Sequence, residues 1–138
     1  MPEKSSDYVE ESNPLFGKIK RPLITIEIFS KTKNLWITVK NVLADTAADV
    51  SILPRYLGEL IVGNTAAGKY VEIRGIVPFS KLVCYIHNLR FKIDDKEFEL
   101  PVAISDSDDT PPILGRKDGL DLFFSTFDGK RTNLSWQE

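Results

Sequence analysis

The most informative stretch of the chain is Leu43-Ala44-Asp45-Thr46-Ala47-Ala48-Asp49-Val50-Ser51-Ile52-Leu53-Pro54. A carboxylate, Asp45, stands here between an apolar segment and a run of small residues, and a second apolar segment follows closely. This pattern predicts two strands joined by a tight loop, with Asp45 partly shielded from water where the first strand ends. The residues themselves leave two interpretations open. Asp45 either caps the backbone of its own loop as an Asx turn or serves as a catalytic carboxylate.

Alternation of apolar and polar residues predicts strands along most of the chain. From Pro22 onward, three isoleucines at alternate positions share one face, and a second run alternates in the same way. The apolar positions of these two runs are Ile24, Ile26 and Ile28, and then Leu35, Ile37, Val39 and Leu43. Two longer alternating segments, 83–93 and 98–104, flank the turn at 94–96 and predict a hairpin. A second hairpin is expected around Asp128-Gly129, because both turn positions tolerate positive φ.

Only one helix is expected, over Arg116 to Phe124, after a turn at Gly115. The residue patterns therefore predict a mostly β protein, either a closed barrel or a sandwich, with one short helix near the C-terminus. Residues 1–13 are polar and without periodicity, so they are expected to form a flexible tail. Residues 14–138 are expected to form a single domain, since 138 residues suffice for one core.

Composition narrows the classes of protein that remain. Hydrophobic residues make up 42% of the chain and charged residues 28%, and the formal net charge is −2. No basic excess points to nucleic acid, and no apolar run approaches the roughly 18 residues that span a bilayer. The one cysteine, Cys84, lies in an apolar run and is expected to be a buried thiol without a disulfide partner. The N-terminus lacks the apolar stretch of a signal peptide, so a cytoplasmic protein without nucleic-acid or membrane partners is expected.

Three other patterns suggest ligands, and each fits poorly. Residues 63–69 match the phosphate-binding loop through its lysine, but Tyr70 stands where a magnesium-binding hydroxyl is needed, and a strand-like segment follows. The aspartates at 106–109 lack the glycine and the final acid of a calcium loop. His87 is the only histidine, so one chain cannot form a two-histidine metal site. Neither a cofactor nor a metal is therefore expected.

Two segments together carry a resemblance to a known family. The stretch around Asp45 resembles the active-site loop of the retroviral-type (retropepsin-like) aspartic proteases, in which an apolar strand precedes Asp, Thr or Ser, Gly, Ala and Asp. Downstream, Pro112-Ile113-Leu114-Gly115-Arg116 resembles the segment that leads into the family's single helix. Between them, residues 71–77 look like the family's flap. The resemblance spans about 22–136 and implies a small closed β-barrel of the retropepsin-like type with one short C-terminal helix.

The resemblance implies that the protein is an aspartic endopeptidase that hydrolyses peptide bonds in extended polypeptides. Asp45 would be the catalytic residue and would activate a water molecule. The sequence holds no second copy of the motif, so catalysis by two carboxylates would require a homodimer with one Asp45 from each chain. The expected partners are a second copy of the chain and a peptide or protein substrate.

The resemblance also implies roles for neighbouring residues. Thr46 would hydrogen-bond across the dimer, Ala47 would offer its backbone to the substrate, and Asp49 would pair with Arg116. The loop residues that would support the site are Thr46, Ala47, Ala48, Asp49 and Arg116, and the flap that would close over substrate contains Gly75, Ile76 and Val77. The segment 134–136 would join the dimer interface.

One residue departs from the family's pattern, because Ala47 stands where glycine is usual. An added methyl group could crowd the substrate or the pair of carboxylates. An alternative function is therefore a catalytically impaired or inactive protease-fold dimer that acts as a peptide-binding or structural module.

Overall fold

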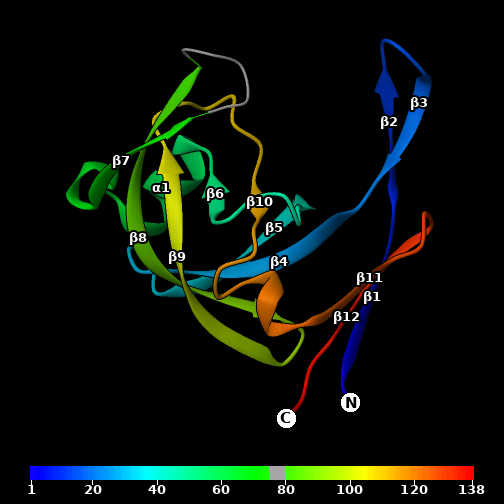
Figure 1. Ribbon diagram of the computed structural model, residues 1–138. Helices are drawn as coiled ribbons and strands as arrows, with labels where there is room; N and C mark the ends of the chain where they lie inside the picture. The colour runs from blue at the N-terminus through cyan, green and yellow to red at the C-terminus, as the bar shows by residue number, and fades with distance from the viewer. Residues whose placement is uncertain (75–79) are drawn as a thin grey trace.

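The computed structural model describes residues 1–74 and 80–138, and it contains a closed barrel of six strands (Figure 1). Around the barrel the strands follow the order β4-β5-β10-β6-β9-β8, and β4 pairs with β8 to close the ring. Their bounds are β4 Leu23–Ser30, β5 Leu35–Ala44, β6 Ser51–Leu53, β8 Lys81–Ile93, β9 Lys96–Ser105 and β10 Ile113–Leu114. The expected mostly β class is confirmed, and of the two predicted architectures the barrel is correct.

Two smaller sheets accompany the barrel. The first has the order β1-β12-β11 and consists of β1 (Glu3–Asp7), β12 (Arg131–Ser135) and β11 (Phe124–Phe127). The second is a hairpin of β2 (Val9–Asn13) and β3 (Gly17–Arg21). Strand β7 (Lys69–Arg74) extends the barrel sheet along β8. Both predicted hairpins are confirmed, since β8 pairs with β9 and β11 with β12.

The N-terminal residues form strands where the sequence indicated a tail without regular structure. Strand β1 pairs antiparallel with β12, from Glu3 opposite Ser135 to Asp7 opposite Arg131. Strand β2 begins two residues later and pairs with β3. Side chains in β1 alternate between exposed and half-buried positions, but those half-buried positions carry polar residues. Hydrophobic periodicity therefore gives no signal for a strand that is held mainly by its backbone.

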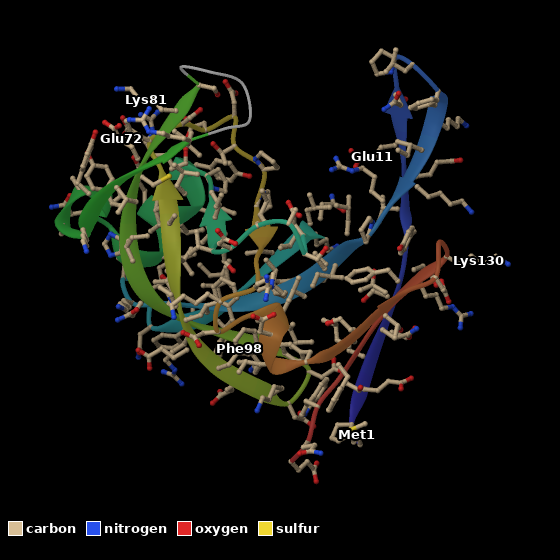
Figure 2. All side chains as sticks on the ribbon, in the orientation of Figure 1. Met1, Glu11, Glu72, Lys81, Phe98 and Lys130 are labelled. Atoms are coloured by element: carbon tan, nitrogen blue, oxygen red, sulfur yellow. The ribbon has the colours of Figure 1, made fainter. Side chains whose placement is uncertain are left out.

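Aromatic side chains connect the barrel to the three-stranded sheet. Phe91 of β8 contacts Phe98 of β9 with the ring centroids 5.9 Å apart, and Phe98 contacts Phe123 at 5.4 Å (Figure 2 labels Phe98). Phe123 in turn meets Trp136 at 5.8 Å, and all three pairs are edge-to-face. Such pairs add about 0.5–1.5 kcal/mol each beyond the area they bury. The chain of rings makes the barrel and the terminal sheet share one core.

A β-bulge in β5 determines which side chains face the core near Asp45. Ile24 and Ile26 of β4 lie opposite Val42 and Val39, so β5 carries one extra residue between these pairs. Asn41, inside the bulge, has φ of 59°, which an asparagine tolerates better than most residues. The bulge moves the buried side of β5 from Val39 to Val42, a shift that simple alternation does not reveal.

The expectation that Leu43 shares the buried face of Ile37 and Val39 is therefore wrong. Ala44 is buried beside Val42, and Leu43 is half-buried on the opposite side. Because side chains alternate along a strand, the bulge also turns Asp45 to the side of Leu43, away from the barrel core.

The helices differ from the prediction. An α-helix, α1 (Arg55–Val62), forms directly after β6, where none was expected. Leu57 and Ile61 are buried on one face at the spacing of a helical turn, and Gly58 packs so closely on Ile104 that any larger side chain would collide there. These positions follow Pro54 and precede Gly63 in the left-handed region, which are signals for a helix that the sequence contained.

The helix predicted over 116–124 is wrong apart from one turn. Only a short 3₁₀ turn, η2 (Leu120–Leu122), forms there, and β11 begins at Phe124. Asp118 has φ of 52° and Gly119 has φ of −122° and ψ of −106°, so neither backbone can continue an α-helix. A second 3₁₀ turn, η1 (Thr65–Ala67), precedes β7. In the described parts of the chain, no helix is both long and apolar enough to cross a membrane.

The bulge residue provides a test of this register. Replacing Asn41 by Val should lower the free energy of unfolding by about 1–2 kcal/mol, because a β-branched residue is strained at positive φ. Asn41→Gly should be close to neutral. Urea unfolding checks both variants, with Thr38→Val on the same strand as the control. Equal stability of Asn41→Val and the wild type would contradict the register described.

Candidate active site

The loop that carries Asp45 is held by the short strand β10, which passes between the two strands that the loop joins. Strand β10 lies parallel to β5, with Leu114 beside Ala44, and antiparallel to β6, with Ile113 beside Ile52. The backbone N–H of Asp45 donates to the carbonyl of Leu114 at 3.0 Å. The position of Asp45 is therefore fixed by a segment almost 70 positions later in the sequence, as the numbering shows.

The Asp45 side chain forms the Asx turn that the sequence left open. Its Oδ1 accepts a hydrogen bond from the backbone N–H of Ala47 at 2.9 Å, and the carbonyl of Asp45 accepts from Ala48 at 3.2 Å. Asp45 is nevertheless half-buried rather than fully exposed. The Asx hydrogen bond engages one carboxylate oxygen, which orients the group and leaves Oδ2 available for a water molecule or a second carboxylate. The structural and the catalytic interpretation are thus compatible.

Asp45 borders an open hollow of about 390 Å³ on the surface of the chain. Its lining comes from the N-terminal segment, the end of β5 and the end of β11, namely Tyr8, Pro22, Leu43, Ala44, Asp45, Thr46 and Phe127. Thr46 also borders a second hollow, together with Ser125 of β11 and Arg116. The loop therefore lies at the surface between the barrel and the terminal sheet, where a further chain or a substrate can reach it.

The structure places Thr46 and Ala47 exposed and Ala48 half-buried. Ala47 is not among the described residues with positive φ, which are Asn34, Asn41, Asp94 and Asp118 apart from the glycines. Alanine therefore occupies this backbone position without the strain that a side chain suffers in the left-handed region. The departure from glycine costs the loop no conformational strain.

Arg116 has a different ionic partner from the one expected. Its guanidinium donates to both carboxylate oxygens of Asp121, at 3.2 Å and 3.4 Å, instead of pairing with Asp49. These hydrogen bonds and the charge of Asp121 raise the pKa of Arg116, with a smaller contribution from the charge of Asp49. Asp121 lies in η2, the turn that replaces the predicted helix, and in that helix residues five positions apart would not have faced each other.

Backbone hydrogen bonds, not an ion pair, connect the loop to the segment after β10. The N–H of Arg116 donates to Ala48 O and the N–H of Lys117 donates to Asp49 O, both at 2.9 Å. Ala48, Asp49 and Arg116 therefore link the loop to the segment after β10 through their main-chain atoms.

Ser51 is a supporting residue that the sequence analysis missed. Its hydroxyl is fully buried and accepts a hydrogen bond from the N–H of Gly115 at 2.9 Å. Gly115 itself approaches the loop so closely that a Cβ would lie 2.5 Å from the carbonyl oxygen of Val50. A hydroxyl residue inside an otherwise apolar strand was the signal that could have identified Ser51.

The predicted flap residues Gly75, Ile76 and Val77 lie outside the described residues. The strands that lead to them, β7 and β8, pair up to Arg74 opposite Lys81. Glu72 on β7 lies beside Lys81 (Figure 2), and Lys81 Nζ is 3.6 Å from Glu72 Oε1. Glu72 Oε1 also accepts a hydrogen bond from the Tyr70 hydroxyl at 2.7 Å. That hydrogen bond and the charge of Lys81 lower the pKa of Glu72. In the described parts of the chain, no three acidic, histidine or cysteine side chains gather closely enough to hold a metal ion.

The chain is similar in fold to a solved retropepsin-like aspartic protease. A retropepsin-like aspartic protease from Rickettsia conorii superimposes with a TM-score of 0.56, over 99% of this chain and 95% of the other, at 16% sequence identity. EIAV protease, solved in complex with an inhibitor, covers 77% of this chain and 88% of its own with a TM-score of 0.46 at 19% identity. Neither a family model nor a curated protein matches the sequence.

The fold is therefore retropepsin-like, as the two sequence motifs implied. At 16% identity the likeness establishes the architecture, which extends over nearly the whole of both chains. The chemistry must be argued from the residues of the loop itself.

The buried serine provides a test of how the loop is held. Ser51→Ala should lower the free energy of unfolding by about 1–3 kcal/mol, because the N–H of Gly115 would lose its acceptor in the interior. Thr132→Val is a matched control, since the buried hydroxyl of Thr132 has no hydrogen-bond partner among the described residues. The control should be as stable as the wild type or more stable. Chemical unfolding of both variants decides, and a neutral Ser51→Ala would show that this hydrogen bond does not hold the loop.

Proposed function

We propose that the protein is an aspartic endopeptidase that acts as a homodimer, with one Asp45 from each chain at a shared twofold axis. The observation that carries the proposal is the placement of Asp45. Its carboxylate is half-buried, is oriented by the N–H of Ala47, and borders an open hollow lined by the N-terminal segment and by the ends of β5 and β11. The retropepsin-like fold supports the proposal.

The dimer follows from the chemistry that two carboxylates perform together. When two carboxylates lie about 3 Å apart they cannot both ionise easily, so the pair shares one proton. The chain contains one such motif, at Asp45, and the sequence repeats it nowhere else. A second copy of the chain supplies the missing carboxylate, and a twofold axis brings the same residue from both chains together.

Because the pair holds one proton, one carboxylate acts as the general base and the other as the general acid. The ionised Asp45 takes a proton from a bound water, whose oxygen attacks the carbonyl carbon of the scissile peptide bond. The protonated Asp45 hydrogen-bonds the carbonyl oxygen and donates its proton as the tetrahedral intermediate forms. The carboxyl that took the proton from water then gives it to the departing amide nitrogen, and the C–N bond breaks. As the intermediate collapses to a carboxylic acid, the other Asp45, which is now ionised, takes back a proton from one of its hydroxyl groups, so the pair again shares one proton.

Strand β11 is the part of the terminal sheet that favours contact with the second copy. It lies at the edge of the sheet, with Phe124 exposed, and its Ser125 borders the same hollow as Thr46. An edge strand offers unpaired backbone groups to another chain. Leu134 and Trp136, which were expected at the interface, are buried within their own chain, so the contact would be made through β11 and Thr46 instead.

An extended polypeptide fits this site best as substrate. The paired strands β7 and β8 lead toward the segment expected to form the flap, and a strand edge binds an extended peptide through main-chain hydrogen bonds. Residues 75–77 would then cover one side of the peptide, and the backbone of Ala47 would contact its opposite side.

The carboxylate is tested by Asp45→Asn, which keeps the size of the side chain and removes its ionisable group. We expect hydrolysis of an unfolded polypeptide to fall by about 10²–10⁴-fold. Asp95→Asn is the control, because Asp95 is an exposed acid in the distant β8–β9 turn. The readout is the appearance of new peptide termini across a range of acidic to neutral pH. A wild-type dimer that cleaves nothing, or an Asn variant that cleaves equally well, would refute the proposal.

Ala47→Gly separates the protease from the alternative of an impaired peptide-binding module. Because Ala47 is exposed and its backbone is unstrained, we expect kcat to change by less than about tenfold. Steady-state kinetics of the two forms provides the measurement. If the glycine variant gains more than this in kcat, the natural chain is an impaired enzyme and the module becomes the better description.

A further inference from the structure

The β2–β3 hairpin is the part of the molecule that the proposed catalytic mechanism does not use. It stands apart from the barrel in Figure 1, and within residues 1–74 and 80–138 its two strands pair only with each other. Two-stranded hairpins are marginally stable in water unless something packs on them. A further contact is therefore expected to stabilise this hairpin.

The tip of the hairpin is a well-formed turn that presents two large apolar side chains. Leu15 is 83% exposed and Phe16 is 74% exposed. Asn13 Oδ1 accepts hydrogen bonds from the N–H groups of both residues, at 2.9 Å and 3.0 Å, and Gly17 completes the turn with φ of 76°. The backbone is thus specified by turn-forming residues, while the side chains it displays are those expected of a buried contact.

The base of the hairpin is fixed beside the catalytic loop. Tyr8 and Pro22, the residues that flank the hairpin, both line the hollow that contains Asp45. The carbonyl of Pro22 accepts a hydrogen bond from the N–H of Ala44 at 3.1 Å, and the N–H of Tyr8 donates to Lys130 O at 2.8 Å. A second polypeptide bound in the hollow at Asp45 would therefore lie next to the base of the hairpin.

An ion pair links the two strands of the hairpin beside the barrel. Arg21 approaches Glu11 across the two strands at 3.6 Å, and both side chains border a smaller hollow of about 170 Å³ together with Val9 and Leu43. Figure 2 shows Glu11 on the side of the hairpin that faces the barrel. Glu11 is 42% exposed at its side chain, but its Oε1 is covered and has no hydrogen-bond partner in the described part of the chain. The hydrogen bonds of Tyr8 and Pro22 fix the base of the hairpin, and the exposed tip has no partner among the described residues.

We propose that the β2–β3 hairpin is an arm that docks on a second copy of the chain, with Leu15 and Phe16 packed against the partner. The choice of occupant rests on the proposed function, because Asp45 is half of a catalytic pair and the other half comes from an identical chain. A five-residue strand spans roughly 17 Å, comparable with the radius of a domain of this size, so an arm rooted beside Asp45 reaches well onto the partner. Twofold symmetry then makes the contact twice.

The test replaces both tip residues by serine in the full chain, Leu15→Ser with Phe16→Ser. These side chains are exposed, so the fold should survive. We expect the dimer dissociation constant, measured by analytical ultracentrifugation, to rise by at least about tenfold, with the loss of peptide hydrolysis recovered at higher protein concentration. Leu35→Ser is the control, because Leu35 is 49% exposed at the opposite end of β5 from Asp45. It should leave the dissociation constant unchanged.

A crosslinking measurement locates the contact directly. Phe16→Cys carries a photoreactive maleimide at the tip, and the natural Cys84 stays unmodified because it is fully buried and burial raises its pKa to about 11. In a mixture of isotopically labelled and unlabelled chains, the arm should crosslink to the other chain. Crosslinks confined to one chain would overturn the proposal.

The outcomes separate this inference from the proposed activity. A wild-type chain that stays monomeric at every concentration overturns both. A wild-type dimer that cleaves peptide while the double variant dimerises equally tightly overturns the arm alone. If the variant raises KM for peptide at an unchanged dissociation constant, the tip contacts substrate and the arm is again refuted. A weakened dimer in a chain that cleaves nothing supports the arm and refutes the protease.

Discussion

The insertion of β10 between β5 and β6 is the constraint on which the rest of the site depends. The loop after β5 can place Asp45 at the surface only because Leu114 accepts its N–H and because Gly115 fits against the carbonyl of Val50. Neither contact can form until the chain has returned after β9. The Asp45 loop is contiguous in the sequence, but its stability depends on a distant segment. A substitution near Gly115 would therefore displace the Asp45 carboxylate, far away in the chain.

The sequence predicted the class of the fold because alternation reports burial. The prediction failed for elements whose backbone conformation does not depend on which side chains are buried. Strand β1 carries polar residues and is held by backbone pairing with β12, so it gave no periodic signal. The turn at η2 is decided by backbone angles at Asp118 and Gly119, which a helical pattern conceals. The bulge at Asn41 reverses the alternation itself. In each case the missing information is a backbone conformation rather than a side-chain preference.

In the candidate site too, features that depend on side chains could be predicted, and features that depend on the backbone could not. Asp45 could be singled out from its position between apolar strands, and the supporting role of the loop was expected. The partners could not be named, because Ala48 and Asp49 act through carbonyl groups that every residue possesses. Ser51 was the exception, since a buried hydroxyl requires a partner. The Asx turn at Asp45 also shows that a carboxylate can stabilise its own loop while one oxygen remains available for chemistry.

The pairing of β1 with β12 has a topological consequence. The two ends of the chain emerge side by side in Figure 1, and the N–H of Trp136 donates to the carbonyl of Pro2 at 3.2 Å. The described polypeptide is thus nearly a closed loop. A short linker from Glu138 to Met1 would complete the circle, and new ends opened in the exposed β8–β9 turn would give a permuted chain with the same contacts around Asp45.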